Sequence, residues 1–298
     1  MAQEHRKVRG TLLLIASCVA FAGAGSLVRL AADLGASRIA LFRFVVGLGL
    51  LAAAAVTGKV TLRFHNGRLL LLRGLTGGGA VAIAFFAIAH LGLGKGTLIM
   101  SSYPIFACIF SAIFLKERFG LINAVALPAA FAGIYLLSIS GSGDALWVLG
   151  RYELITIGGA VLSGIAVTVI RKLHETDTSA AIYFSQCAIG MWLVLLPGLG
   201  DPAPLGLPQA VLLVAIGVTA TIGQLLMTEG YRYLPVRTGS LICMLEPVLA
   251  FAAGIMIFSE PFTARSGAGA VLVVGACAMV LTGRTPPDRA APVIEPAA

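Results

Sequence analysis

Long apolar runs separated by short polar connectors dominate this chain from end to end. A bilayer core about 30 Å thick requires about 20 apolar residues per helix. Ten runs meet that length, and the connectors between them leave no room for a soluble domain. We therefore predict an all-α membrane protein with ten transmembrane helices, at residues 11–31, 37–57, 69–91, 95–115, 122–140, 153–172, 179–197, 208–230, 238–258 and 264–282.

The chain contains one unit twice. Residues 91–119 and 234–262 overlay with a constant shift of 143 and no gap, and they share Leu91/Leu234, Gly96/Gly239, Leu98/Leu241, Ile99/Ile242, Pro104/Pro247, Ala107/Ala250, Glu117/Glu260 and Phe119/Phe262. A Gly-rich stretch, Ser140 to Arg151, separates the two halves. We expect two five-helix repeats, at residues 8–140 and 152–284, followed by a disordered tail at 285–298.

Lysine and arginine placement predicts the orientation in the membrane. With both termini in the cytoplasm, inside segments carry fifteen of these residues and outside segments carry six, which agrees with the positive-inside rule. Since each half has an odd number of spans, the two repeats are then inverted relative to one another. The inside residues are Arg6, Lys7, Arg9, Lys59, Arg63, Arg68, Arg73, Lys116, Arg118, Arg171, Lys172, Arg232, Arg237, Arg284 and Arg289, and the outside ones are Arg29, Arg38, Arg43, Lys95, Arg151 and Arg265.

Composition narrows the function. Hydrophobic residues make up 58% of the chain and charged residues 11%, against about 25% charged in a soluble domain. The net charge of +8 lies in short loops that orient helices, so we expect no nucleic-acid partner. The five cysteines lie inside apolar runs without Cys-x-x-Cys spacing, which indicates packing and no metal site, disulfide framework or cofactor.

Two enzymatic alternatives lack their motifs. Gly92 to Thr97 is glycine-rich, but it lacks the order of a phosphate-binding loop and follows no strand. A membrane enzyme acting on lipids would need a nucleophile or clustered metal ligands, and the four histidines are far apart in sequence. We therefore expect no catalytic residues and no ATP hydrolysis.

Two equivalent mid-helix positions are the first candidate site residues. Glu246 precedes Pro247 in the ninth run and aligns with Tyr103 before Pro104 in the fourth. Each proline frees a backbone carbonyl, which a polar cavity can satisfy and lipid cannot. Equivalent positions of an inverted repeat meet near the midplane, so we predict that both side chains face a shared substrate cavity, where Glu246 could carry a coupling proton. The alternative is a structural glutamate bonded to a neighbouring helix.

Other polar residues form stripes at helical spacing. The fourth run carries Thr97, Ser101, Pro104, Cys108 and Ser111, the eighth Gly217, Thr221, Gln224 and Thr228, and the seventh Ser179, Tyr183, Gln186 and Gly190. Such faces line a water-filled path or form interhelical hydrogen bonds, and the pattern leaves both open. The further substrate-binding candidates are Ser102, Gln224, Phe86, His90 and Arg43, although His90 also suits a solvated helix end and Arg43 a structural role.

Two more patterns predict structural roles. We expect the glutamates Glu117, Glu229 and Glu260 to form ion pairs with adjacent basic residues. Such pairs would stabilise gates at the ends of the helices. Glycine-rich faces at Gly74 to Gly79, Gly158 to Gly164 and Gly267 to Gly269 predict close helix packing.

Residues from about 8 to about 284, the extent of the apolar spans, resemble the drug/metabolite transporter superfamily, in its EamA-type branch of ten-helix exporters. The resemblance rests on Arg43-Phe44, on Pro104 with Ala107 and Glu117, and on Tyr231 to Pro235 followed by Glu246-Pro247-Val248 and Glu260. It implies a central cavity near the fourth and ninth helices, alternating access, and export of small organic solutes such as amino acids, their derivatives or drugs. Other branches carry nucleotide sugars or sugar phosphates.

One position departs from the family pattern. Members often have a tryptophan in the first helix, where this chain has Phe21. Phe86, Tyr103 and Phe106 still suit an aromatic or bulky substrate. We therefore expect a secondary transporter of the bacterial cytoplasmic membrane that exports amino acids or similar metabolites; a passive facilitator remains the alternative mechanism.

Overall fold

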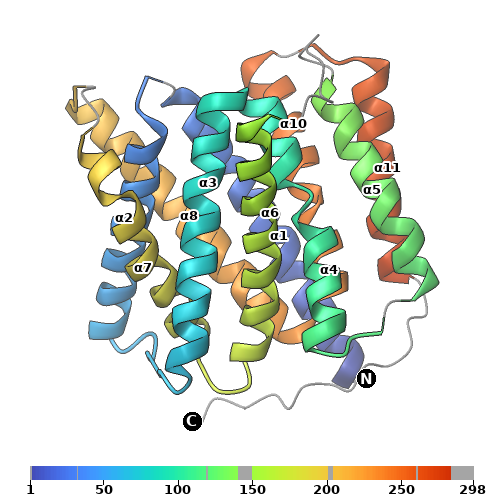
Figure 1. The fold of residues 1–298 in the computed structure, drawn as a ribbon, viewed down its shortest axis with the longest axis horizontal. Coiled ribbons are helices and arrows are strands. Elements are labelled where there is room, and N and C mark those ends of the chain that lie inside the picture. The colour runs from blue at the N-terminus through green and yellow to red at the C-terminus, as the bar shows by residue number, and fades with distance from the viewer. Residues whose placement is uncertain are drawn as a thin grey trace.

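A computed structural model describes residues 2–31, 33–118, 120–139, 150–200, 204–259 and 261–282. Within these residues the chain forms only helices, which lie side by side in one bundle (Figure 1). The predicted tail at 285–298 and Glu260 lie outside the described residues. The helices are α1 (Ala2–Leu30), α2 (Ala36–Val56), α3 (Gly67–Met100), α4 (Tyr103–Phe114), α5 (Leu121–Ile139), α6 (Arg151–Leu173), α7 (Ser179–Leu199), α8 (Leu207–Tyr233), α9 (Val236–Cys243), α10 (Leu245–Phe258) and α11 (Ala264–Thr282).

The predicted ten-helix membrane fold is confirmed. Nine segments of the described chain are long and apolar enough to cross a membrane, and the apolar stretch Leu121–Leu137 of α5 is a shorter tenth. Two spans are each built from two pieces: the fourth from the end of α3 plus α4, and the ninth from α9 plus α10.

The helix α3 holds two spans because the chain reverses direction within it, between the span that ends at Ile88 and the span that begins at Lys95. A straight helix separates residues nine apart by about 13.5 Å. A Cβ added to Gly96 would lie only 3.0 Å from the carbonyl carbon of Ala87. The third and fourth runs are therefore separate spans, as the sequence predicts, and Gly96 is needed because the two backbones touch there.

Helix bounds repeat along the chain with the shift seen in the sequence. Moving the bounds of α2 by 143 residues gives those of α7, and moving the bounds of α5 gives those of α11. The backbone thus repeats the pattern of the sequence even where the residues differ.

Contacts between connectors show that the repeats are inverted. We call the end of the bundle where α1 begins the inner side, which is the side predicted to be cytoplasmic. There the Glu117 carboxylate, which follows α4, accepts a hydrogen bond from the backbone N–H of Val236 at the start of α9 (2.9 Å). The fourth span therefore ends where the ninth begins, so these equivalent spans run in opposite directions.

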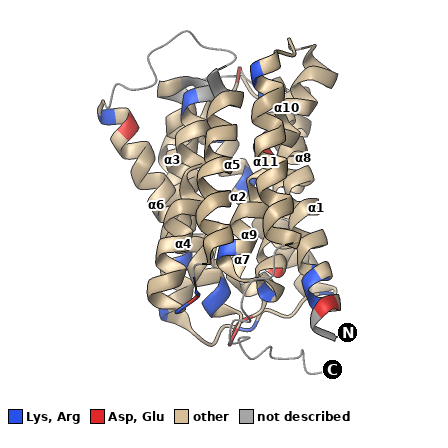
Figure 2. Cartoon of the chain, turned by 90° about the vertical axis from the view of Figure 1, so that its right-hand side faces the viewer, with Lys and Arg blue, Asp and Glu red and all other residues tan. Residues whose placement is uncertain are grey.

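The two ends of the described chain lie on the inner side. Lys7 Nζ in α1 donates to the carbonyl of Leu281 in α11 at 2.8 Å. Figure 2 shows lysines and arginines gathered at this end of the bundle, with others inside it and at the far end. This distribution follows the predicted charge asymmetry.

The glycine-rich faces pack helices closely, as predicted. A Cβ on Gly78 of α3 would lie 2.6 Å from the Cα of Gly190 in α7, and one on Gly269 of α11 would lie 2.6 Å from the carbonyl oxygen of Gly133 in α5. No side chain fits at these crossings, so van der Waals contact between backbones holds these pairs together.

Candidate functional site

Two helix breaks lie at equivalent positions of the repeats. The helix α3 ends at Met100 and α4 begins at Tyr103, while α9 ends at Cys243 and α10 begins at Leu245. The intervening Ser101 and Met244 are related by the internal shift of 143 residues. Each break comes just before a proline, Pro104 or Pro247, because the ring cannot donate into the preceding turn. The predicted interruptions are present in the described chain.

Thiols occupy the break between α9 and α10. Cys277 Sγ in α11 donates to the carbonyl of Leu241 at 3.1 Å, and Cys18 Sγ in α1 lies 3.7 Å from the carbonyl oxygen of Ile242. All five cysteines are buried and free. Packing was the only role predicted for them, and their hydrogen bonds to the broken helix were missed since the sequence does not show which helices meet there.

Tyr103 and Glu246 lie within electrostatic range of one another at the two breaks. Both residues are partly buried in the bundle. The Tyr103 phenol also interacts with Tyr231 of α8. The two candidates thus lie near one another at the breaks, and their role in lining a substrate cavity stays a prediction.

Arg43 of α2 joins this group. Its Nη2 donates to Oε1 of Gln224 in α8 at 3.4 Å, and its guanidinium carbon lies 5.7 Å from the ring centroid of Phe21 in α1. Glu246 lies within electrostatic range of Arg43. Phe21, at the position where family members often carry tryptophan, therefore lies beside the candidate site.

The described contacts of the remaining candidates, Ser102, His90 and Phe86, do not include Arg43. Ser102 Oγ donates to the carbonyl of Ile99 at 2.7 Å, within the break itself. His90 is exposed, its Nδ1 lies 2.9 Å from the Phe86 carbonyl oxygen, and its ring stacks on Tyr152 at 4.7 Å between centroids. Phe86 and His90 thus form an aromatic group with the outer end of α6, and a role for them in substrate binding remains a prediction.

Arg73 corrects the orientation analysis, which counted it among the charges of an inner connector. Its side chain is only 2% exposed, and it donates to Oε1 of Gln186 in α7 at 2.6 Å. A Cβ on Gly77 would lie 1.6 Å from its Nη1, so the guanidinium extends one helical turn deeper into the bundle. An arginine that only marked the membrane edge would extend outward instead. The sequence signal that was missed is Gly77, four residues after Arg73. A glycine at that position leaves the space that the folded-back guanidinium occupies.

The polar stripes of α7 and α8 form interhelical hydrogen bonds. Tyr183 and Thr221 are hydrogen-bonded at 3.0 Å, and both are buried. Together with the Arg73 to Gln186 bond, this contact favours the structural interpretation of the seventh-run stripe over a water-filled path.

Glu117 bonds to the start of α9. Its carboxylate accepts the backbone N–H groups of Val236 and Arg237 at 2.9 and 3.3 Å, and its pairing with Lys116 or Arg118 stays a prediction. A carboxylate at this position satisfies the unpaired donors of the first turn of α9 and complements its dipole. Since Arg237 also donates to the carbonyl of Arg118, the α4–α5 and α8–α9 connections close on one another at the inner side.

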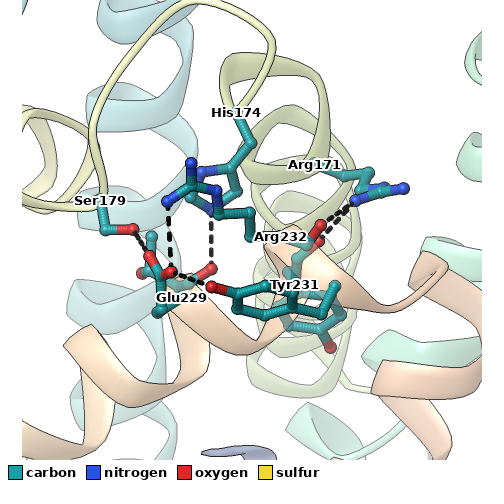
Figure 3. A network of polar contacts seen from close by, with 8 residues as sticks. Arg171, His174, Ser179, Glu229, Tyr231 and Arg232 are labelled. Atoms are coloured by element: carbon teal, nitrogen blue, oxygen red, sulfur yellow. Dashed lines mark hydrogen bonds and ion pairs between the residues drawn. The ribbon is translucent and has the colours of Figure 1, made fainter. Parts of the chain in front are cut away.

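A second polar network lies at the inner ends of α6 and α8 (Figure 3). Glu229 accepts hydrogen bonds from Ser179, from Arg232 at 3.3 Å and from the Tyr233 hydroxyl at 3.0 Å. The predicted pairing of Glu229 with a nearby basic residue is therefore confirmed. Arg171 donates to the carbonyls of Tyr231 and Arg232 at 3.1 and 2.6 Å, which caps the end of α8.

His174 lies in this network just after the span of α6 and predicts a pH-dependent stability. Its Nε2 donates to the carbonyl of Thr228 at 2.8 Å. Burial lowers the pKa of His174 to about 4; the Thr228 carbonyl and Glu229 oppose that effect, while Arg232 and Arg171 add to it. The unfolded chain binds this proton near pH 6.5, so between pH 6.5 and 4 the unfolded state holds more protons and stability falls as pH falls.

We expect His174 to lower the free energy of unfolding by up to about 3 kcal/mol across that window. Thermal unfolding in detergent at pH 7.5 and pH 4.5 measures the effect. His174→Gln keeps a donor for Thr228 and cannot titrate, so its melting temperature should fall much less on acidification. An equal fall in both proteins would contradict the role of His174.

The inverted bundle and its paired helix breaks define a class, that of membrane transporters built from two repeats around a central site. Comparison with known proteins agrees: the model of the EamA-like transporter family matches residues 8–139 and again 150–282. This chain belongs to the EamA-like transporter family. It is a small-molecule transporter spanning the membrane several times, and it is not an enzyme.

Relatives cover most of the chain. The pseudopaline exporter CntI of Pseudomonas aeruginosa is 28% identical over 279 residues, which cover 90% of this chain and 94% of the exporter. Solute carrier family 35 member G1 of Mus musculus is 25% identical over 89% of this chain and 76% of its own length. A solved crystal structure with 17% identity matches 91% of this chain and 95% of its own with a TM-score of 0.77, which supports the fold alone.

Proposed function

We propose that this transporter exports amino acids or their derivatives across the cytoplasmic membrane of a bacterium by alternating access. One observation carries the proposal. The cation of Arg43 and the carboxyl of Glu246 lie within electrostatic range, and neither takes part in the ion pairs of the described residues. Opposite charges that interact inside a bundle without forming an ion pair suit a solute that carries both charges.

Three further features support the proposal. The ring of Phe21 lies 5.7 Å from the Arg43 guanidinium, and Tyr103 interacts with Tyr231; these aromatic groups suit a bulky or aromatic side chain. The pseudopaline exporter is by name a protein that moves a metabolite outward, which favours export. Glu246 is the acid of the site, so it is our candidate for a coupling proton.

Alternating access follows from the inverted repeat. The inner side is closed by the contacts of Glu117 and Arg237 with the opposite connection. In this cycle one repeat rocks against the other, so these contacts open when the site faces the cytoplasm.

Counterflow in proteoliposomes tests the function. A thermal-shift screen against amino acids, nucleosides and sugars first finds a solute that stabilises the purified protein, and a labelled pool of that solute then measures exchange. We expect saturable exchange, which separates a carrier from a passive facilitator. Tyr103→Ala should lower the exchange rate roughly tenfold or more through loss of a contact in the site, whereas Tyr103→Phe, which keeps the ring, should lose less.

Either of two results would refute this function: wild-type protein that exchanges none of these solutes, or a flux that rises linearly with solute concentration without saturating. Full exchange by Tyr103→Ala would remove Tyr103 from the site and leave the transporter function intact.

A further inference from the structure

The structure contains two arginine–glutamine bonds that join equivalent pairs of helices in the internal repeat. Arg43 of α2 and Gln186 of α7 are equivalent under the shift of 143 residues. Arg43 donates to Gln224 of α8, while Gln186 accepts from Arg73 of α3. Because α2 corresponds to α7 and α8 to α3, the two bonds join equivalent pairs of helices, and each bond links one repeat to the other.

The bond between Arg73 and Gln186 is complete. It measures 2.6 Å, both side chains are 2% exposed, and Nε2 of Gln186 donates in turn to the carbonyl of Gly77 at 3.4 Å. Both ends of this amide have protein partners, while Nε of Arg73 has none. This pair serves to hold α3 against α7.

The bond between Arg43 and Gln224 is incomplete. It measures 3.4 Å, against 2.6 Å for the bond between Arg73 and Gln186, and Arg43 is partly accessible to solvent. Gln224 is 3% exposed, yet its Nε2 has no hydrogen-bond partner. A buried amide donor without a partner is costly unless a ligand or water satisfies it.

We propose that the guanidinium of Arg43 and the free amide N–H of Gln224 bind the carboxylate of the transported solute. A guanidinium presents parallel donors that match the two oxygens of a carboxylate, and the orphaned Nε2 of Gln224 supplies a third donor beside them. This assignment rests on the proposed transport function and names the chemical class of its substrate.

Charge favours a carboxylate over a phosphate. Among the described residues Arg43 is the cation that bonds to Gln224, and Glu246 lies within electrostatic range of Arg43. A monoanion that also carries an ammonium group balances these two charges, whereas a phosphate dianion would add repulsion with Glu246.

Matched acids and amides test the subsite. L-phenylalanine, L-leucine and L-methionine are each compared with their C-terminal amides, which keep the ammonium group and lose the carboxylate. We expect wild-type protein to bind at least one acid roughly 10- to 100-fold more tightly than its amide, by titrated thermal shift and by inhibition of counterflow.

The repeat offers a matched pair of variants. Gln224→Glu places a carboxylate beside Arg43 that pairs with it internally, so the preference for the acid should fall to about threefold or less. Gln186→Glu makes the same change beside Arg73, outside the subsite, and should leave the preference unchanged. Arg43→Gln, which removes the cation, should also abolish the preference.

The possible outcomes distinguish a failure of the carboxylate subsite from a failure of the transport function. Counterflow of phosphorylated or neutral solutes without binding of any carboxylate would overturn the subsite and keep the transporter. An acid preference that survives both Gln224→Glu and Arg43→Gln would likewise overturn it. Wild-type protein with no counterflow of any solute would refute the transport function itself.

Discussion

Glu246→Gln is expected to abolish the response of transport to a pH gradient and to lower uphill transport roughly tenfold or more. The variant keeps the shape and hydrogen-bonding capacity of the side chain but cannot bind or release a proton. Glu246 is the carboxyl of the group formed with Tyr103 and Arg43, so its loss removes the acid that could couple a proton to the solute. Proteoliposomes with imposed pH gradients measure both effects.

The control is Glu175→Gln. Glu175 pairs with Lys172 at 2.5 Å on the inner surface, where its side chain is 30% exposed. Removing that charge should leave the pH profile as it is in the wild type. If Glu246→Gln kept the wild-type profile, the residue would not be the proton carrier, although exchange without a gradient could still assign it to substrate binding.

Linking the two inner connections is expected to stop transport. Arg118→Cys and Pro235→Cys, combined in one chain, put thiols on either side of the contact that joins Glu117 and Arg237 to the opposite connection. A short bis-methanethiosulfonate reagent would tie the repeats together at the inner side. Because this side must open to take up solute from the cytoplasm, exchange should fall roughly tenfold or more and recover on reduction.

Each single variant treated with the same reagent is the control, since it can be labelled but not linked. The five native cysteines are buried and can stay in place. Linked protein that exchanges solute at the unlinked rate would show that the inner connections do not separate during transport.

The fold could be predicted almost completely from the sequence because a membrane leaves few choices. Apolar runs of fixed length must be helices, and a repeat with an odd number of spans inverts the second half. The shift of 143 residues that aligns Pro104 with Pro247 also relates the bounds of α2 to those of α7. The repeat therefore predicts where helices begin and end even at positions where the side chains of the two halves differ.

The contacts of individual polar residues were harder to predict. Arg73 was assigned to a connector because position along the chain does not show that its side chain folds back over Gly77. The bond of Glu117 to the start of α9 was missed because sequence distance does not show that the two lie side by side. Both cases concern contacts between repeats, which depend on packing in three dimensions.

The candidate site was predicted in part. Proline after Tyr103 and Glu246 marked the two breaks, and the structure brings these residues together with Arg43 and Gln224. The thiol of Cys277 against the break was missed, since a cysteine in an apolar run is usually a packing residue.

The most direct test asks from which side the space at the helix breaks can be reached. Ser102→Cys places a thiol at the break before α4, and a membrane-impermeant thiol reagent is applied to right-side-out and inside-out vesicles, with the parent protein as the background. After the inner connections have been linked, the account predicts labelling from the outer side only, and after reduction it predicts labelling from both. Equal labelling from the inner side while the link is intact, or no labelling from either side in any state, would contradict a central site reached alternately between two inverted repeats.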